Sequence, residues 1–206
     1  FYIVESKLKQ NTIWVGSDDG LIHLTKNGGK DWENISPKHH DEAMINSIEL
    51  SPHKEGRAYA AVTGYKLNDT RPYIYKTDNY GKAWYRIDKN LPSNAYVRVV
   101  REDPAKEGLL YAGTENGIYF SHNNGQNWHS LQLNLPNVPI TDLRIRQNNL
   151  IVATQGRAFW VLDDLFVVRQ FHDDINDKGI HFFQPDPTPL LPNSRRVGNF
   201  EGKNPN

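Results

Sequence analysis

The chain has 206 residues, and its 24 Lys and Arg residues balance 24 Asp and Glu residues, so the formal net charge is zero. Nucleic acids and anionic membranes attract proteins with a basic excess, so neither is expected as a partner. The apolar runs are too short for a transmembrane span, and the lack of cysteine excludes disulfides, thiol nucleophiles and cysteine-bound zinc.

Three segments share the pattern Ser/Thr-x-Asn-x-Gly-x-x-Trp and end at Trp32, Trp84 and Trp128. The tryptophans are 84 − 32 = 52 and 128 − 84 = 44 residues apart. A period of about 40–50 residues is typical of four-stranded propeller blades. A second pattern keeps the same phase: a Ser or Asp stands eight positions before an aromatic residue, at Ser6, Ser51 and Asp103.

Each repeat is interpreted as four strands, A to D, separated by short polar turns. In chain order the expected strands are 2–5, 13–16, 21–25 and 33–35; then 46–50, 57–63, 73–77 and 85–87; then 96–101, 109–113, 118–121 and 129–131; and finally 140–146, 150–154 and 158–162. The fourth copy lacks the Asn-Gly turn, as atypical terminal repeats often do. Almost no helix is expected.

The sequence therefore predicts an all-β fold of about four propeller blades, each of four antiparallel strands, in a propeller that is larger than this chain. The repeats are placed near 1–38, 39–90, 91–135 and 136–169, so blades occupy 1–169. Residues 170–206 are expected to form a terminal strand near 180–183 and an extended, proline-rich linker from Gln184 toward a further domain.

The repeated turn joins strands C and D, and its residue types have physical reasons. Asn and Ser/Thr side chains can bond nearby backbone amides, Gly can adopt a positive φ, and Trp offers a large ring for packing between blades. These roles are structural, and they are assigned to Thr25, Asn27, Gly29, Trp32, Thr77, Asn79, Gly81, Trp84, Ser121, Asn123, Gly125 and Trp128.

The repeated turn resembles the Asp-box (BNR) repeat of β-propellers, which occurs in sialidases, xyloglucanases, sortilin-type receptors and photosystem II assembly factors. The family pattern has Asp where this chain has Asn27, Asn79 and Asn123. Residues 14–20 and 156–165 carry a closer resemblance, to bacterial sortilin-like or glycosyl-hydrolase-like BNR proteins. This resemblance implies an exported protein, whether periplasmic, cell-surface or extracellular, and further blades of the same protein as partners.

In a propeller the B–C and D–A loops share one face, where ligands usually bind. The candidate catalytic carboxylates on this loop face are Asp18, Asp19 and Glu115. Further candidate ligand contacts are His39, Lys66, Arg71 and Arg157; Lys66 and Arg71 belong to the one long B–C loop, 64–72. The run 39–42 (His-His-Asp-Glu) lacks the spacing of a metal site, so neither a metal nor a cofactor is expected.

Three functions remain open on sequence grounds. The first is a non-catalytic segment that binds a carbohydrate or protein ligand on the loop face. The second is part of a glycoside hydrolase, related to sialidases or xyloglucanases, whose remaining catalytic residues lie in other blades. The chain lacks the Arg-Ile-Pro motif of a sialidase site, which favours the first function over the second. The third is an assembly or scaffold factor.

Overall fold

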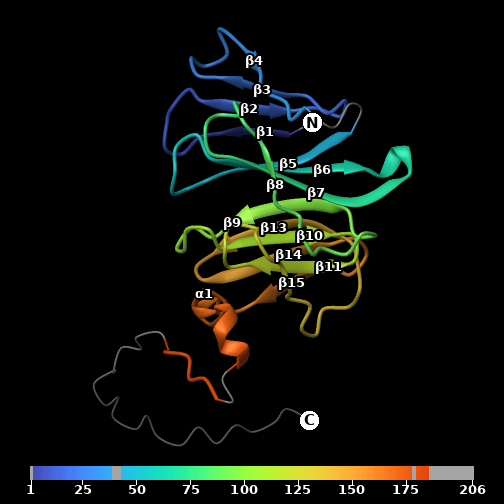
Figure 1. Ribbon diagram of the computed structural model, residues 1–206, viewed down its shortest axis with the longest axis vertical. Coiled ribbons are helices and arrows are strands. Elements are labelled where there is room, and N and C mark those ends of the chain that lie inside the picture. Colours follow the sequence, from blue (N-terminus) through green and yellow to red (C-terminus); the bar gives the residue numbers. More distant parts are fainter. Residues whose placement is uncertain (1, 39–42, 178–179, 186–206) are drawn as a thin grey trace, which may run out of the picture.

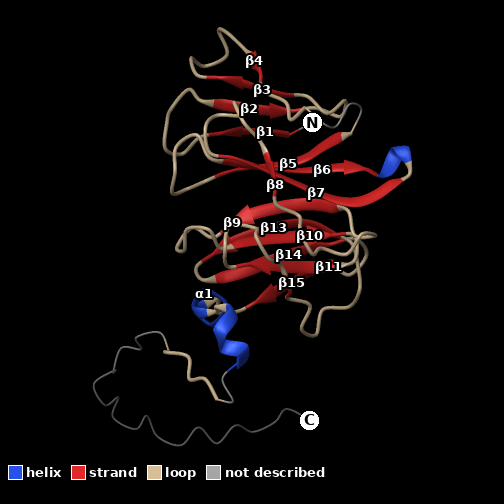
Figure 2. Ribbon diagram, viewed as in Figure 1, coloured by secondary structure: helices blue, strands red, loops and turns tan. Residues whose placement is uncertain are grey.

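The computed structural model describes residues 2–38, 43–177 and 180–185, and within them it contains four antiparallel sheets (Figures 1 and 2). Blade 1 consists of β1 (Tyr2–Glu5), β2 (Ile13–Gly16), β3 (Ile22–Thr25) and β4 (Glu33–Asn34). Blade 2 consists of β5 (Met44–Leu50), β6 (Ala58–Gly64), β7 (Asp69–Thr77) and β8 (Tyr85–Arg86). Blade 3 consists of β9 (Val97–Glu102), β10 (Leu110–Thr114), β11 (Gly117–Ser121) and β12 (His129–Ser130). Blade 4 has three strands, β13 (Ile140–Arg146), β14 (Asn149–Thr154) and β15 (Phe159–Leu162).

Strands follow chain order within every sheet, so each blade is a simple meander, and the all-β propeller-blade prediction is confirmed. Except for β7, the observed strands begin and end within two residues of the predicted positions. In the second repeat, the segment expected to be a long loop mostly continues the strands. Gly64 of β6 pairs with Asp69 of β7, and the 3₁₀-helix η1 (Tyr65–Leu67) turns the chain between them.

The segment after blade 4 differs from the prediction. Residues 180–183 form no strand; instead, the helix α1 (Phe166–Gln170) and the 3₁₀-helix η2 (Asp173–Asp177) follow β15. Val168 and Phe171 pack against the core that blades 3 and 4 share, and Arg169 Nε lies 3.0 Å from Oδ2 of the buried Asp103. The predicted linker lies largely outside the described residues. Among the described residues, no helix is both long and apolar enough to span a membrane.

The hydrophobic core lies between blades, in three clusters that each draw side chains from two neighbouring sheets. Strands β6 and β10 are buried along their whole length, because each is covered on both faces. Strand β2 alternates between buried and partly exposed residues, and Phe159 and Val161 of β15 are exposed on blade 4. The two end blades therefore each leave one apolar face open.

The repeated C–D turns are closed by side-chain hydrogen bonds, and two of them also bond to the preceding blade. In blade 3, Asn123 Oδ1 accepts the backbone N–H of Asn127 at 3.0 Å, and Ser121 Oγ accepts that of Gly125 at 2.9 Å. The other two turns repeat these bonds. The indole N–H groups of Trp84 and Trp128 each donate to a carbonyl of the preceding blade, that of Ile35 and that of Ile87, at 2.6 Å.

Blade 1 has no such cross-blade bond at its turn. The indole N–H of Trp32 donates to Gly29 of its own turn at 3.1 Å, and the side chain is 46% exposed. Trp128, by contrast, is 3% exposed. The same sequence motif thus has two environments, which depend on whether a neighbouring blade is present.

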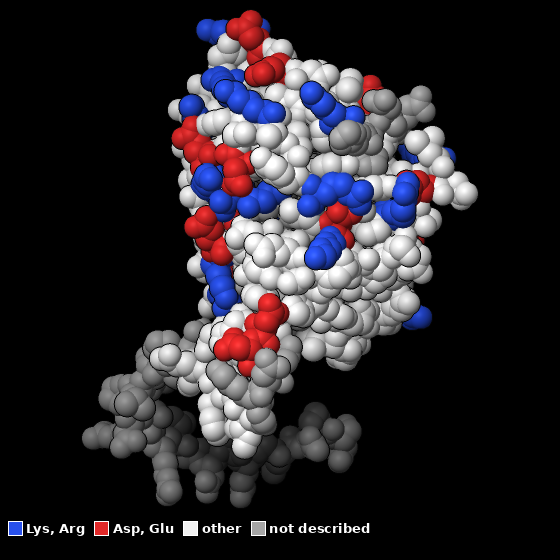
Figure 3. All heavy atoms as spheres, viewed as in Figure 1, with Lys and Arg blue, Asp and Glu red and all other residues white. Residues whose placement is uncertain are grey.

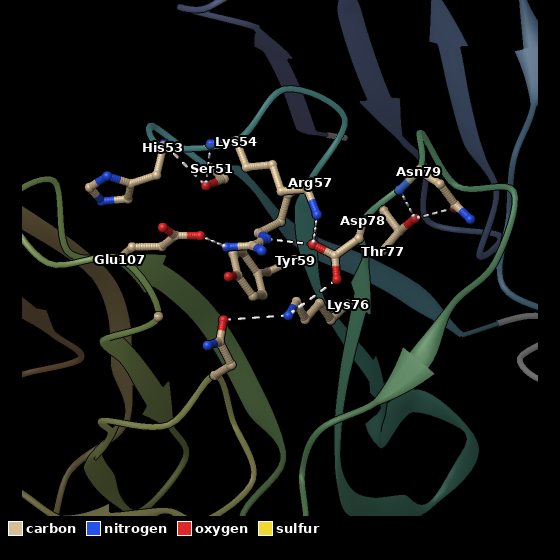
Figure 4. Close-up of polar contacts among 12 residues, drawn as sticks. Ser51, His53, Lys54, Arg57, Tyr59, Lys76, Thr77, Asp78, Asn79 and Glu107 are labelled. Carbon is tan, nitrogen blue, oxygen red and sulfur yellow. Dashed lines mark hydrogen bonds and ion pairs between the residues drawn. The ribbon is translucent and has the colours of Figure 1, made fainter. Parts of the chain in front are cut away.

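A charged network joins the A–B turns of blades 2 and 3 (Figure 4). Arg57, whose side chain is 9% exposed, lies between Asp78 of its own blade and Glu107 of blade 3, with Nη1 2.6 Å from Glu107 Oε1. Lys76 contacts Asp78 and also reaches Asn124 of blade 3 at 3.4 Å. Polar contacts between these turns therefore add to the apolar contacts that hold blades 2 and 3 together.

Substitution of Trp128 by Ala should destabilise the chain far more than the same change at Trp32. Trp128→Ala removes a buried ring and a cross-blade hydrogen bond, which costs about 3–5 kcal/mol, whereas Trp32→Ala removes a half-exposed ring and should cost about 1 kcal/mol or less. Urea-induced unfolding followed by circular dichroism measures both changes. Equal losses in the two variants would contradict this account of the turns.

Candidate ligand-binding site

The extended β6–β7 hairpin of blade 2 leans over the beginning of blade 3. Tyr65, at the tip of the hairpin, stacks on Tyr96 with ring centroids 5.3 Å apart and planes 17° from parallel. Tyr65 remains 42% exposed, while Tyr96 is buried beneath it. One face of an aromatic pair is thus presented to solvent on the loop face of the blades.

An ion pair supports this aromatic pair from below. Arg98 of β9 places Nε and Nη2 each 2.8 Å from Glu115 Oε2, and its Nη2 also donates to the Tyr96 hydroxyl at 3.0 Å. The amide side chain of Asn46 in blade 2 donates to the Arg98 carbonyl at 3.2 Å. These contacts fix Tyr65, Tyr96, Arg98 and Glu115 as one group, called here the loop-face cluster.

Among the sequence-predicted site residues, Glu115 belongs to the loop-face cluster. Asp18 and Asp19 are exposed in the B–C turn of blade 1, and no described contact joins either of them to Glu115. The hydroxyl of Ser17 donates to Asp19 and lowers the pKa of that carboxyl. The proposed carboxylates are therefore separated, and Asp19 is held in its ionised form.

The predicted basic contacts also stay apart from one another. Arg71 pairs with Asp69 of its own strand, with Nη2 2.8 Å from Oδ2, and Lys66 is exposed on η1 beside Tyr65. Arg157 is exposed in the B–C turn of blade 4. His39 lies outside the described residues.

Sequence reasoning missed a cavity of about 250 Å³ between the inner strands β1, β5, β9 and β13. Its lining includes Glu49, Arg101 and Arg144, which lie near the ends of their strands that lead into the A–B turns, and Tyr2, the first residue of β1. Burial raises the pKa of Glu49 to about 7, although the nearby charge of Arg101 favours the ionised form. The sequence did contain one signal of this cavity, because its A strands carry charged residues among apolar ones.

Arg101 connects the two sides of this cavity. Its Nη1 lies 3.6 Å from Glu49 Oε2, its Nη2 lies 2.6 Å from Asp142 Oδ1, and its Nε donates to the carbonyl of Leu143 at 3.0 Å. The guanidinium is thus fixed between blades 2 and 4. The cavity places one acid with a raised pKa beside one immobile cation, an arrangement typical of functional sites.

The surface charge matches the neutral composition. On the face shown in Figure 3, Lys and Arg side chains are interspersed with Asp and Glu side chains, without a broad region of one sign. This face therefore produces no strong long-range field of one sign.

Comparison with known proteins shows similarity to propellers of two kinds. No protein-family model matches the chain. A curated relative, the oligoxyloglucan-reducing end-specific xyloglucanase of Emericella nidulans, is 24% identical over 105 residues, which are 50% of this chain and 13% of that protein. The chain thus spans only a small part of this relative.

Two solved structures support the same fold. YCF48 bound to a D1 peptide matches with a TM-score of 0.58 and 18% identity, over 79% of this chain and 51% of that one. The GH74 xyloglucanase from Xanthomonas campestris matches with a TM-score of 0.60 and 14% identity, over 79% of this chain and 28% of that one. At these identities the likeness establishes a β-propeller segment. It does not transfer a site.

Glu49→Gln should change the pH dependence of stability. The folded-state pKa of Glu49, about 7, lies above the ordinary glutamate value of 4.5, so the folded protein keeps a proton that the unfolded chain loses. The contribution of Glu49 therefore becomes less favourable as pH rises from about 5 to about 8, and the Gln variant should gain about 1–3 kcal/mol relative to wild type over that range.

Urea unfolding of both proteins at the two pH values measures this gain. Asp69→Asn is the control: bonds from Arg71 lower the pKa of Asp69, so that carboxyl is ionised in both states throughout this range. The stability difference between this variant and wild type should not vary with pH. A Glu49→Gln difference that is equally constant would refute the raised pKa.

Proposed function

We propose that this chain is a ligand-binding segment of an exported β-propeller, and that its ligand, a carbohydrate or a protein segment, docks on the loop-face cluster. The observation that carries the proposal is the exposed ring of Tyr65, held in place by stacking on Tyr96. A rigid aromatic face loses little conformational entropy on binding and is common at interaction sites. Leu67, which is 54% exposed, extends the apolar surface beside it.

The ion pair in the cluster favours binding over catalysis. Glu115 is engaged by two nitrogens of Arg98, so its carboxyl group is not free to act as a nucleophile. Hydrolysis of a glycosidic bond requires two carboxyl groups about 5–10 Å apart, one of them with a raised pKa. The described contacts bring no second carboxylate to Glu115.

The second candidate function, a share in a glycoside hydrolase site, is favoured by Glu49. Its raised pKa suits a general acid near neutral pH, and the cavity beside it has room for part of a sugar ring. This cavity opens near the A–B turns rather than on the loop face. Under this alternative, Glu49 is the residue of this chain that carries the chemistry.

The open face of blade 1 supports a further partner, another blade of the same protein. Trp84 and Trp128 each reach a carbonyl of the preceding blade, whereas Trp32 is half exposed and bonds within its own turn. Ile3 on the same blade is 71% exposed. A preceding blade would supply the carbonyl and the apolar cover that the repeat geometry gives to the other two turns. Export remains a proposal that rests on the resemblance to BNR proteins.

Tyr65→Ala should weaken ligand capture by the chain strongly. Arrays of oligosaccharides, including xyloglucan fragments, and arrays of peptides serve as the probes, and the expected result is retention of members of one class by wild type with at least about tenfold weaker binding by the variant. Tyr85→Ala is the matched control, because Tyr85 is 61% exposed on β8 and lies outside the cluster.

Two outcomes would overturn the proposal. One is no retained probe of either class. The other is capture that is equal in wild type and Tyr65→Ala. Release of reducing sugar from xyloglucan by wild type, lost in Glu49→Gln and kept in Tyr65→Ala, would instead establish the hydrolase alternative.

A further inference from the structure

A group of two histidines and one aspartate lies at the outer edge of blade 3, apart from the loop-face cluster and the central cavity. His122 follows β11 in the C–D turn, His129 begins β12, and Asp173 begins η2. Each residue offers one ligand atom, and these atoms all lie within 4.8 Å of one another. A segment after the last blade thus meets the outermost strand of the preceding one.

The distances within this group match a coordination sphere. Nε2 of His122 lies 3.0 Å and Nε2 of His129 lies 3.3 Å from Asp173 Oδ1. Ligand atoms about 2.0–2.2 Å from a tetrahedral zinc ion stand about 3.3 Å from one another. Small side-chain rotations would therefore bring the three atoms around one ion.

Hydrogen bonds among the three side chains, without a metal, explain only part of this geometry. Nε2 of His122 and Oδ1 of Asp173 are within hydrogen-bond distance. Nε2 of His129, however, is buried and forms no hydrogen bond with any described group, despite its proximity to the carboxylate. A buried ring nitrogen that lies beside a carboxylate without forming a well-aligned hydrogen bond is poorly stabilised, and coordination to a cation would satisfy it.

The surroundings hold both imidazole rings in place. The centroid of the Phe171 ring lies 5.5 Å from that of His122 and 5.0 Å from that of His129. The centroid of the Phe120 ring lies 5.4 Å from that of His129. Asp173 stays more than half exposed, which leaves a route for an ion from solvent. An apolar shell with one open side is typical of metal sites with a free coordination position.

Blade 3 differs from the other blades at these two positions. The residues that correspond to His122 and His129 are Lys26 and Glu33 in blade 1, and Asp78 and Tyr85 in blade 2. The turn itself needs neither histidine, because its Ser, Asn, Gly and Trp residues make the repeated bonds. Among the three blades that carry the turn, only blade 3 has the histidine pair, and it is the blade to which η2 supplies an aspartate.

We propose that His122, His129 and Asp173 bind a divalent transition-metal ion of the zinc class, which clamps η2 onto the outer edge of blade 3. Two imidazoles and one carboxylate favour zinc, nickel or copper over calcium and magnesium, which prefer oxygen ligands. The three side chains leave one position for water. The role that follows is mechanical: metal binding holds the segment that leaves the last blade.

Titration of the metal-free chain with Zn²⁺, followed by calorimetry, tests the site. Wild type should bind one ion tightly, and His122→Ala, His129→Ala and Asp173→Asn should each weaken binding at least tenfold. Asp174→Asn and His23→Ala are the matched controls and should bind as wild type does. Ca²⁺ should not compete.

Two further measurements separate loss of the site from loss of the fold. Co²⁺ bound to wild type should show the visible absorption of a tetrahedral site, and His122→Gln, which keeps a polar side chain, should lose it while its circular dichroism is unchanged. Zn²⁺ should raise the Tm of wild type but not that of Asp173→Asn. Absence of binding, or binding that is equal in all the variants, would show that the group is only a hydrogen-bonded contact and overturn the proposal.

Discussion

The contact between one sheet and the next is the constraint on which the rest of this structure depends. A single blade here has strands of about two to nine residues and cannot bury both of its faces alone. Burial becomes complete only where two neighbours are present, as β6 and β10 show. The indole bonds from Trp84 and Trp128 fix the angle and register of this packing, because each links a turn of one blade to the end of the preceding one.

Both candidate sites follow from this packing. The loop-face cluster exists because the β6–β7 hairpin is long enough to cross the blade boundary, so that Tyr65 rests on Tyr96. The central cavity exists because the inner strands converge without filling the space between them, and Arg101 then connects Glu49 with Asp142 across it. Neither site belongs to one blade, so each depends on the inter-blade angle.

The sequence was sufficient to predict the blades because their determinants are local and repeated. The Asn-Gly turn and the Trp period fixed the strands to within about two residues, apart from β7. The start of β7 was missed because a run with Asn and Pro looks like a loop, yet Gly64 pairs with Asp69. Helix α1 was missed because its place depends on a distant contact, the ion pair between Arg169 and the buried Asp103.

The sites were harder to predict because they too depend on contacts between residues that lie far apart in the sequence. Glu115 was selected as a carboxylate on the loop face, but its engagement by Arg98 depends on strand register that residue types do not reveal. The environment of Glu49 and the meeting of His122, His129 and Asp173 are likewise long-range results of the fold. Local chemistry predicts an element, whereas the ionisation and partners of a side chain depend on what the neighbouring blade places beside it.

The same dependence on neighbouring blades bears on the two functions proposed for the chain. A carboxyl group serves as a general acid only if its surroundings favour its neutral form. On the loop face, Arg98 engages Glu115 in an ion pair and Ser17 favours ionised Asp19, which suits recognition by hydrogen bonds and aromatic contact. In the cavity, burial keeps Glu49 protonated up to about neutral pH. The chain thus separates the aromatic pair of the loop-face cluster from its one described carboxyl group with a raised pKa, so the binding proposed for the loop face does not involve that acid.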